Sequence, residues 1–212
     1  MKVLVFGAGG NIGRAITAEL LSRGHAVTAA SRTGAQAEGL GVPIAVGDAA
    51  DADTVARLAQ GQDAVVAAIG PKPGAAVSDG AFSGPAHGLI AGLRQAGVRR
   101  LLVLGGAGSL EVAPGQRVVD GPDFPDVWKP NALGQAEALD IYRTAADLDW
   151  TYVSPAAIIQ PGERTGVYRI GGDQLLVDAA GQSRISIPDY AAGFVDELEQ
   201  GDAIRRRITV AY

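Results

Sequence analysis

The stretch that decides the fold reads Lys2-Val3-Leu4-Val5-Phe6-Gly7-Ala8-Gly9-Gly10-Asn11-Ile12-Gly13. Its first part is a short apolar run typical of a buried strand, and residues 11–23 have helical periodicity. The glycines between them suit a tight crossing from strand to helix. Gly7 permits the turn, Gly10 lets the backbone approach a ligand, and Gly13 lets the helix pack closely. The sequence therefore predicts a strand-turn-helix unit at the N-terminus.

This turn is also suited to bind a diphosphate. The backbone N–H groups of Asn11 and Ile12 lie at a helix N-terminus, where they have no partner within the helix and attract an anion. Gly9 adds a second position without a side chain beside them. Glycines between a predicted strand and a predicted helix match the context of a dinucleotide-binding fingerprint. We predict that Gly7, Gly9, Gly10 and Gly13 surround the cofactor phosphates.

The rest of the chain alternates strands and helices. Apolar runs predict strands at 26–31, 43–46, 64–69, 100–104 and 150–154, and helical patterns lie at 51–60, 86–96 and 132–146. This order predicts an α/β fold of the Rossmann type, with a doubly wound, mostly parallel sheet. Residues 166–187 suggest a β-hairpin, followed by a helix from Asp189 to about 199 and a last strand at 207–210. We expect one domain over 1–212, in which 155–212 completes an acceptor cleft.

The residues at the end of the second strand indicate which form of the cofactor binds. NAD-binding proteins place an acidic residue there to hold the ribose hydroxyls. This chain has Ser31-Arg32-Thr33 instead. A guanidinium at Arg32 can bind a 2′-phosphate through two charge-assisted hydrogen bonds. The sequence favours NADP(H) over NAD(H), although a solvated loop arginine is the alternative interpretation of Arg32.

Two further segments are candidates for contact with the nucleotide. Asp48, followed by Ala49, comes directly after the third strand, where its carboxylate can accept from the adenine amino group or act as a helix N-cap. The fourth strand runs into small residues that leave room for a ribose. We expect the cofactor to lie over Ala67, Ala68, Ile69 and Gly70.

Composition excludes several classes of function. The chain has no cysteine and two histidines, so we expect no metal site and no cysteine nucleophile. The net charge of −5 gives no basic face for nucleic acid. The single basic run, Arg205-Arg206-Arg207, is expected to be solvated. Without a membrane span or a signal segment, we expect a cytoplasmic protein, monomeric or homodimeric.

The whole chain resembles the atypical short-chain dehydrogenases, specifically the NAD(P)H-binding, NADH-flavin reductase-like branch related to biliverdin reductase B. The resemblance rests on the glycine turn, on Arg32, and on the segments Val46-Gly47-Asp48, Val103-Leu104-Gly105-Gly106-Ala107-Gly108-Ser109 and Ser154-Pro155-Ala156-Ala157. It implies a nicotinamide lying over Gly105, Gly106 and Ala107, with its carboxamide near the backbone from Pro155 and Ala156 to Ile158.

The catalytic pair of typical short-chain dehydrogenases, Tyr-x-x-x-Lys, is missing. The corresponding helix has Lys129 at the tyrosine position and Leu133 at the lysine position, and Tyr142 is followed four residues later by Ala146. Alcohol oxidation and epimerisation therefore lose support, because both need a strong proton donor or base.

Reduction of a flavin or quinone needs no such donor, because hydride passes to an electron-poor ring and water can supply a proton. In this hypothesis Ser109 polarises an acceptor oxygen, while Lys129 neutralises charge or binds the phosphate of FMN. The alternatives are a turn cap for Ser109 and a solvated position for Lys129.

Three functional hypotheses follow. The first is an NAD(P)H-dependent oxidoreductase that reduces a flavin, quinone or similar small acceptor, with FMN or FAD as acceptor rather than prosthetic group. The second is a redox sensor that binds NADP(H) without turnover. The third is a reductase or isomerase of a specialised small metabolite.

Overall fold

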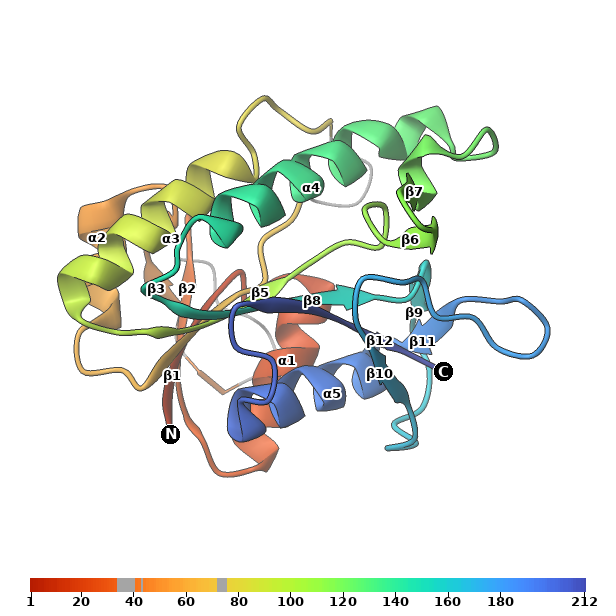
Figure 1. Cartoon of the computed structure of the whole chain (residues 1–212). Coiled ribbons are helices and arrows are strands. Elements are labelled where there is room, and N and C mark those ends of the chain that lie inside the picture. The colour runs from red at the N-terminus through yellow and green to blue at the C-terminus, as the bar shows by residue number, and fades with distance from the viewer. Residues whose placement is uncertain (34–40, 43, 72–75) are drawn as a thin grey trace.

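The computed structural model describes residues 1–33, 41–42, 44–71 and 76–212. Within them, one large sheet has the strand order β10-β12-β8-β5-β4-β1-β2-β3 (Figure 1). Its strands are β1 (Lys2–Phe6), β2 (Ala26–Ser31), β3 (Ile44–Val46), β4 (Ala64–Ala67), β5 (Arg100–Leu104), β8 (Asp149–Pro155), β10 (Arg169–Gly171) and β12 (Arg206–Ala211). Two small ribbons pair β6 (Glu111–Ala113) with β7 (Gln116–Arg117) and β9 (Ile158–Gln160) with β11 (Arg184–Ser186).

The order of the strands creates a switch point in the sheet. β1 pairs in parallel with β2 on one side and with β4 on the other, so the chain reverses its direction of winding between them. Ligands of doubly wound sheets bind in the crevice at the carboxyl ends of strands flanking such a point. The predicted Rossmann-type, mostly parallel sheet is confirmed, and its crevice lies beside the glycine turn.

Helices cover both faces of the sheet (Figure 1). α1 packs against α5 on one face, and α2, α3 and α4 pack side by side on the other. Each face buries its own apolar core, because apolar side chains point to both sides of these strands. None of the helices in the described part combines the length and apolar character that a membrane crossing requires. Their bounds are α1 Asn11–Ser22, α2 Ala52–Ala59, α3 Ser83–Ala96, α4 Lys129–Arg143 and α5 Ile187–Gln200, with short 3-10 turns at η1 Val118–Asp120 and η2 Asp126–Trp128.

The observed elements follow the predicted order, with shifts at their ends. β5 has the predicted bounds, whereas α4 begins three residues before the expected position 132. Pro130 explains the early start, since proline in the first helical turn has no amide to leave unsatisfied and already has a helical φ. Pro43, the expected first residue of the third strand, lies outside the described residues, as do 72–75 of the loop before α3.

The predicted hairpin over 166–187 is wrong. β10 pairs antiparallel with β12, and β11 pairs parallel with β9, so the two strands of this segment do not pair with each other. The stretch around Leu175 forms no strand; its N–H donates to the carbonyl of Glu111, 2.8 Å away. Alternating apolar residues indicated strands here, but long-range partners decide which strands pair.

Candidate functional site

The glycine turn is held by contacts that exclude side chains. Gly7 has φ of 81°, and a Cβ atom on it would overlap the carbonyl of Ala68, with the carbonyl carbon only 2.7 Å away. A Cβ on Gly13 would overlap the carbonyl oxygen of Gly7 itself. The Gly7 N–H donates to the carbonyl of Ala30 at 3.0 Å, which ties the turn to β2. Packing of β1, β2, β4 and α1 therefore requires Gly7 and Gly13.

Gly10 has a different role. It is the N-cap residue of α1, where no side chain caps the helix and no acidic residue lies in the first turn. A Cβ on Gly10 would make only an ordinary contact, 3.5 Å from the oxygen of Gly7. Gly9, Gly10 and Asn11 are exposed. Backbone amides at the positive end of the helix are thus open to an anion, and the residues present fit the diphosphate of a dinucleotide.

The end of β2 also fits a phosphorylated ribose. The hydroxyl oxygen of Ser31 is buried and has no hydrogen-bond partner among the residues that the structure describes. Arg32 and Thr33 beside it are exposed. A buried hydroxyl without a partner is costly, so it indicates a group missing from its surroundings. No carboxylate follows β2 at these three positions to repel a phosphate.

Asp48 does not cap a helix, so that alternative was wrong. Asp51 is the N-cap residue of α2, and its carboxylate accepts from the N–H of Asp53. Asp48 accepts instead from the N–H of Ala50, at 3.0 Å, and stays exposed after β3, with Ala49 buried behind it. Contact of Asp48 with an adenine stays a prediction.

The ends of β4 and β5 form the middle of the crevice. Ala67 and Ala68 are buried, Ile69 is partly buried and Gly70 is exposed. After β5, a Cβ on Gly105 would lie 2.6 Å from Cδ1 of Tyr152. The small residues at these strand ends therefore allow close packing: the glycine turn lies against Ala68, and the loop after β5 lies against Tyr152.

Helix α4 presents a pair of amides to this loop. A Cβ on Gly106 would lie 2.7 Å from Oε1 and 3.1 Å from Nε2 of Gln135, whose atoms are its three nearest neighbours. Nε2 of Gln135 donates to Oδ1 of Asn131 at 2.6 Å. Neither residue is titratable, so the sequence does not mark them as candidates, although their spacing of four is the spacing of the Tyr-x-x-x-Lys pair.

The sequence model of NAD(P)H-binding proteins matches residues 7–199. The chain belongs to the NAD(P)H-binding family. The match spans the glycine turn, the switch-point crevice and α4, and the expected resemblance to the reductase-like branch is confirmed by relatives at the level of the whole fold.

Relatives of this NAD(P)H-binding protein cover its full length. The protein YwnB of Bacillus subtilis is 39% identical over 213 residues, which are 99% of this chain and 98% of YwnB. A crystal structure from Burkholderia pseudomallei, described as a "putative exported protein", is 47% identical with a TM-score of 0.91, and each chain is covered completely. Another, from Streptococcus pneumoniae, is described as a "putative NADH-flavin reductase"; it is 38% identical, with a TM-score of 0.86 and coverage of 100% and 99%.

The two side chains expected to assist the acceptor both have partners in this NAD(P)H-binding protein. Nη1 of Arg207 donates to Oγ of Ser109 at 2.9 Å and to its carbonyl oxygen at 3.0 Å. Nζ of Lys129 lies 2.7 Å from Oδ1 of Asp126, on the partly exposed start of α4. Ser109 and Lys129 thus have different partners, and a direct role for either in acceptor reduction stays a prediction.

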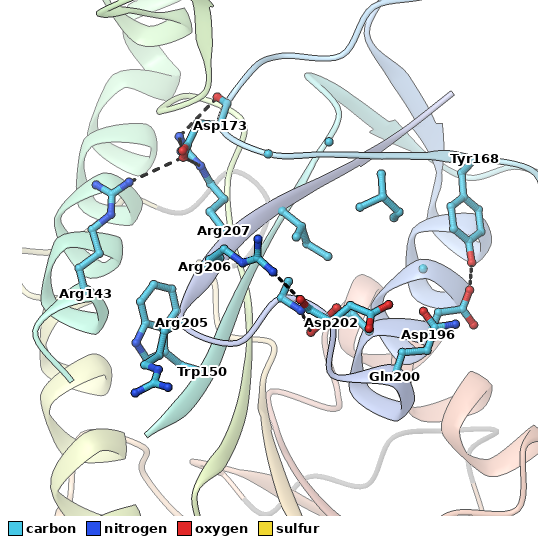
Figure 2. Close-up of a pocket in the computed structure, with 17 residues that line it drawn as sticks. Arg143, Trp150, Tyr168, Asp173, Asp196, Gln200, Asp202, Arg205, Arg206 and Arg207 are labelled. Carbon is cyan, nitrogen blue, oxygen red and sulfur yellow. Dashed lines mark hydrogen bonds and ion pairs between the residues drawn. The ribbon is translucent and has the colours of Figure 1, made fainter. Parts of the chain in front are cut away.

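A cavity of about 630 Å³ lies near the amino-terminal half of β12, the strand next to the edge strand β10 of the large sheet (Figure 2). Arg207 points to Asp173 there, and its side chain is 4% exposed. The expectation of a solvated run was therefore wrong for Arg207, because side-chain alternation along β12 turns it inward; Arg205 and Arg206 are exposed as expected. The acidic groups shown at this cavity include Asp196, which accepts from the hydroxyl of Tyr168.

Proposed function

We propose that the protein is an NADPH-dependent reductase of flavins, quinones or similar flat acceptors. NAD(P)H binding follows from the family, and the choice of acceptor is our proposal. The observation that carries it is the contact of α4 with Gly106, because the side chain nearest to that glycine is an amide and not a proton donor. A reaction that needs no protein-derived proton suits such a site best.

The chain's own residues would hold the cofactor at two places. Backbone amides of Asn11 and Ile12, next to the exposed Gly9 and Gly10, would bind the diphosphate. Ser31 and Arg32 would bind the 2′-phosphate, with the unpartnered hydroxyl of Ser31 as one donor and the exposed guanidinium as another. This arrangement supports NADPH as the preferred form.

When bound, NADPH would supply a hydride; with one proton from water the acceptor becomes its two-electron reduced form, and NADP⁺ is released. The protein's contribution is then to hold two flat rings in contact and to exclude water from between them. Burial raises the pKa of Tyr142, in α4, and of Tyr152, which lies against Gly105, so neither is suited to deliver a proton.

Calorimetry and steady-state kinetics test the proposal. NADPH should bind more tightly than NADH, and NADPH oxidation should become continuous on addition of FMN, riboflavin or menadione. Tight binding of NADPH without turnover on any of these acceptors would favour the alternative of a redox sensor, which the missing Tyr-x-x-x-Lys pair also suits. Absence of binding by either reduced nucleotide would contradict both.

A further inference from the structure

The amide groups of Asn131 and Gln135 lie at the start of α4, over the loop that follows β5. Both side chains are partly buried, and they are joined by the hydrogen bond of 2.6 Å from Gln135 to Asn131. Since Gly106 has no side chain, the carboxamide of Gln135 lies directly against its backbone. The pair thus lies at the carboxyl edge of the sheet, where doubly wound sheets bind their ligands.

Two hydrogen bonds fix this loop and helix relative to each other. The hydroxyl of Tyr152 donates to the carbonyl of Gln135 at 2.9 Å, and the hydroxyl of Ser154 donates to the carbonyl of Gly106 at 2.9 Å. Both hydroxyls come from β8, beneath the loop. The amide pair is therefore placed by the rigid sheet, as a preorganised site requires.

The pair keeps hydrogen-bonding capacity after its internal bond is made. A carboxamide nitrogen carries two donors, so Gln135 retains one and Asn131 retains both. In the part of the chain that the structure describes, neither residue's side chain has another hydrogen-bond partner. An amide donates hydrogen bonds but does not ionise, so it can stabilise a developing negative charge without transferring a proton.

We propose that Asn131 and Gln135 bind a carbonyl oxygen of the acceptor and hold its ring beside Gly106. This inference rests on the proposed reductase function and names the substrate class: conjugated cyclic dicarbonyls, such as quinones and oxidised flavins. Their carbonyl oxygen gains negative charge when hydride arrives, and aimed N–H groups stabilise that charge more than they stabilise the ground state. Water then supplies the proton.

Gln135→Leu tests the pair, because leucine approximates the volume of glutamine and removes the amide. The matched control is Gln95→Leu, which makes the same change at an exposed position on α3. We expect kcat/KM for menadione to fall at least tenfold in Gln135→Leu and to stay within twofold of wild type in Gln95→Leu. Calorimetry in the presence of NADP⁺ should show a matching loss of menadione binding, while the Kd for NADP⁺ changes by less than threefold.

Gln135→Glu gives a second readout that packing alone would not produce. Wild-type activity on menadione should be flat between neutral and mildly acidic pH. The variant should be slow at neutral pH, where the new carboxylate repels the charged oxygen, and should recover as the pH falls and the carboxyl becomes a donor. Asn131→Ala, at the partly buried start of the helix, should weaken menadione binding in the same direction.

The possible failures are distinct. If wild type reduces menadione and Gln135→Leu does so as fast as Gln95→Leu, with equal menadione affinity, the amide pair has only a packing role and the inference is wrong. If wild type neither binds nor reduces menadione or FMN, the proposed reductase function fails, and this inference fails with it.

Discussion

Replacement of single glycines in the first turn separates folding from cofactor binding. In Gly13→Ala the new methyl group would overlap the carbonyl oxygen of Gly7, and the carbonyl carbon would lie 2.9 Å away. Neither atom can move without shifting β1 or α1. Overpacking of this kind costs about 1–3 kcal/mol. For a domain of this size we therefore expect the Tm to fall by roughly 2–12 °C.

Gly10→Ala should have the opposite profile. The backbone of Gly10, at φ −74° and ψ 162°, suits alanine, and the methyl group would meet its nearest atom at 3.5 Å. The weaker N-cap costs about as much as the reduced entropy of the unfolded chain contributes, roughly 0.5–1 kcal/mol each. We expect nearly the wild-type Tm. The methyl group lies, however, at the face where the amides would meet the diphosphate.

In Gly10→Ala we expect this methyl group to prevent one hydrogen bond between the amides and the diphosphate. Loss of one hydrogen bond to a charged group costs about 1.5–3 kcal/mol, which corresponds to a roughly tenfold to hundredfold higher Kd for NADPH. Calorimetric titration of NADPH and NADP⁺ into Gly10→Ala, alongside thermal melts of both variants, measures the two effects separately. Wild-type affinity in Gly10→Ala would refute the assignment of the diphosphate to this turn. A wild-type Tm in Gly13→Ala would refute the packing argument.

Three further predictions concern the replacement of single arginines. Arg32→Ala should raise the Kd for NADPH at least tenfold and leave that for NADH nearly unchanged; equal losses in calorimetry would contradict a 2′-phosphate site. The hydrogen-bonded guanidinium of Arg164 lowers the pKa of Glu19 below its ordinary value of 4.5, against the effect of burial. A carboxyl of this kind stabilises the fold above its unfolded pKa and loses that contribution as pH falls through its native pKa, so the Tm deficit of Arg164→Ala at pH 7 should disappear at strongly acidic pH. Arg207→Ala should lower the Tm by several degrees, from loss of about 1–3 kcal/mol, whereas exposed Arg206→Ala should not; equal melts would show that the buried contacts are not stabilising.

The strand-turn-helix unit at the proposed cofactor site could be predicted from sequence because backbone geometry determines it. A tight turn between strand and helix requires glycine wherever two chain segments approach closely. Gly7 and Gly13 occupy such positions, because a Cβ atom on either would overlap a backbone carbonyl group. The absence of an acidic residue at the end of β2 can likewise be read from three neighbouring residues, Ser31, Arg32 and Thr33. Both features depend on residues within one strand-turn-helix unit and its nearest strand, so spacing alone reveals them.

The tail could not be predicted in the same way. β10 and β12 are about forty residues apart in sequence, and the paired positions Ile158 of β9 and Arg184 of β11 are 26 residues apart. Short alternating segments have no local feature that selects a partner. The inward side chain of Arg207 follows from the same cause, because the orientation of β12 determines which arginine of the run is buried.

The proposed acceptor site depends on the rotation of α4 about its axis, and two contacts fix that rotation. A Cβ on Gly108 would lie 2.5 Å from Cβ of Ala132, and a Cβ on Gly134 would lie 2.8 Å from the ring of Phe82. These close approaches turn Gln135 toward the loop after β5.

Lys129 and Leu133, which stand at the tyrosine and lysine positions of the short-chain dehydrogenase pair, precede Asn131 and Gln135 by two residues each. Two residues correspond to a rotation of about 200° around an α-helix, so the two sets of positions lie on nearly opposite faces of α4. Leu133 is accordingly 47% exposed, and Lys129 pairs with Asp126. In the proposed site, this difference of two positions decides whether α4 would offer the acceptor a charge or an amide.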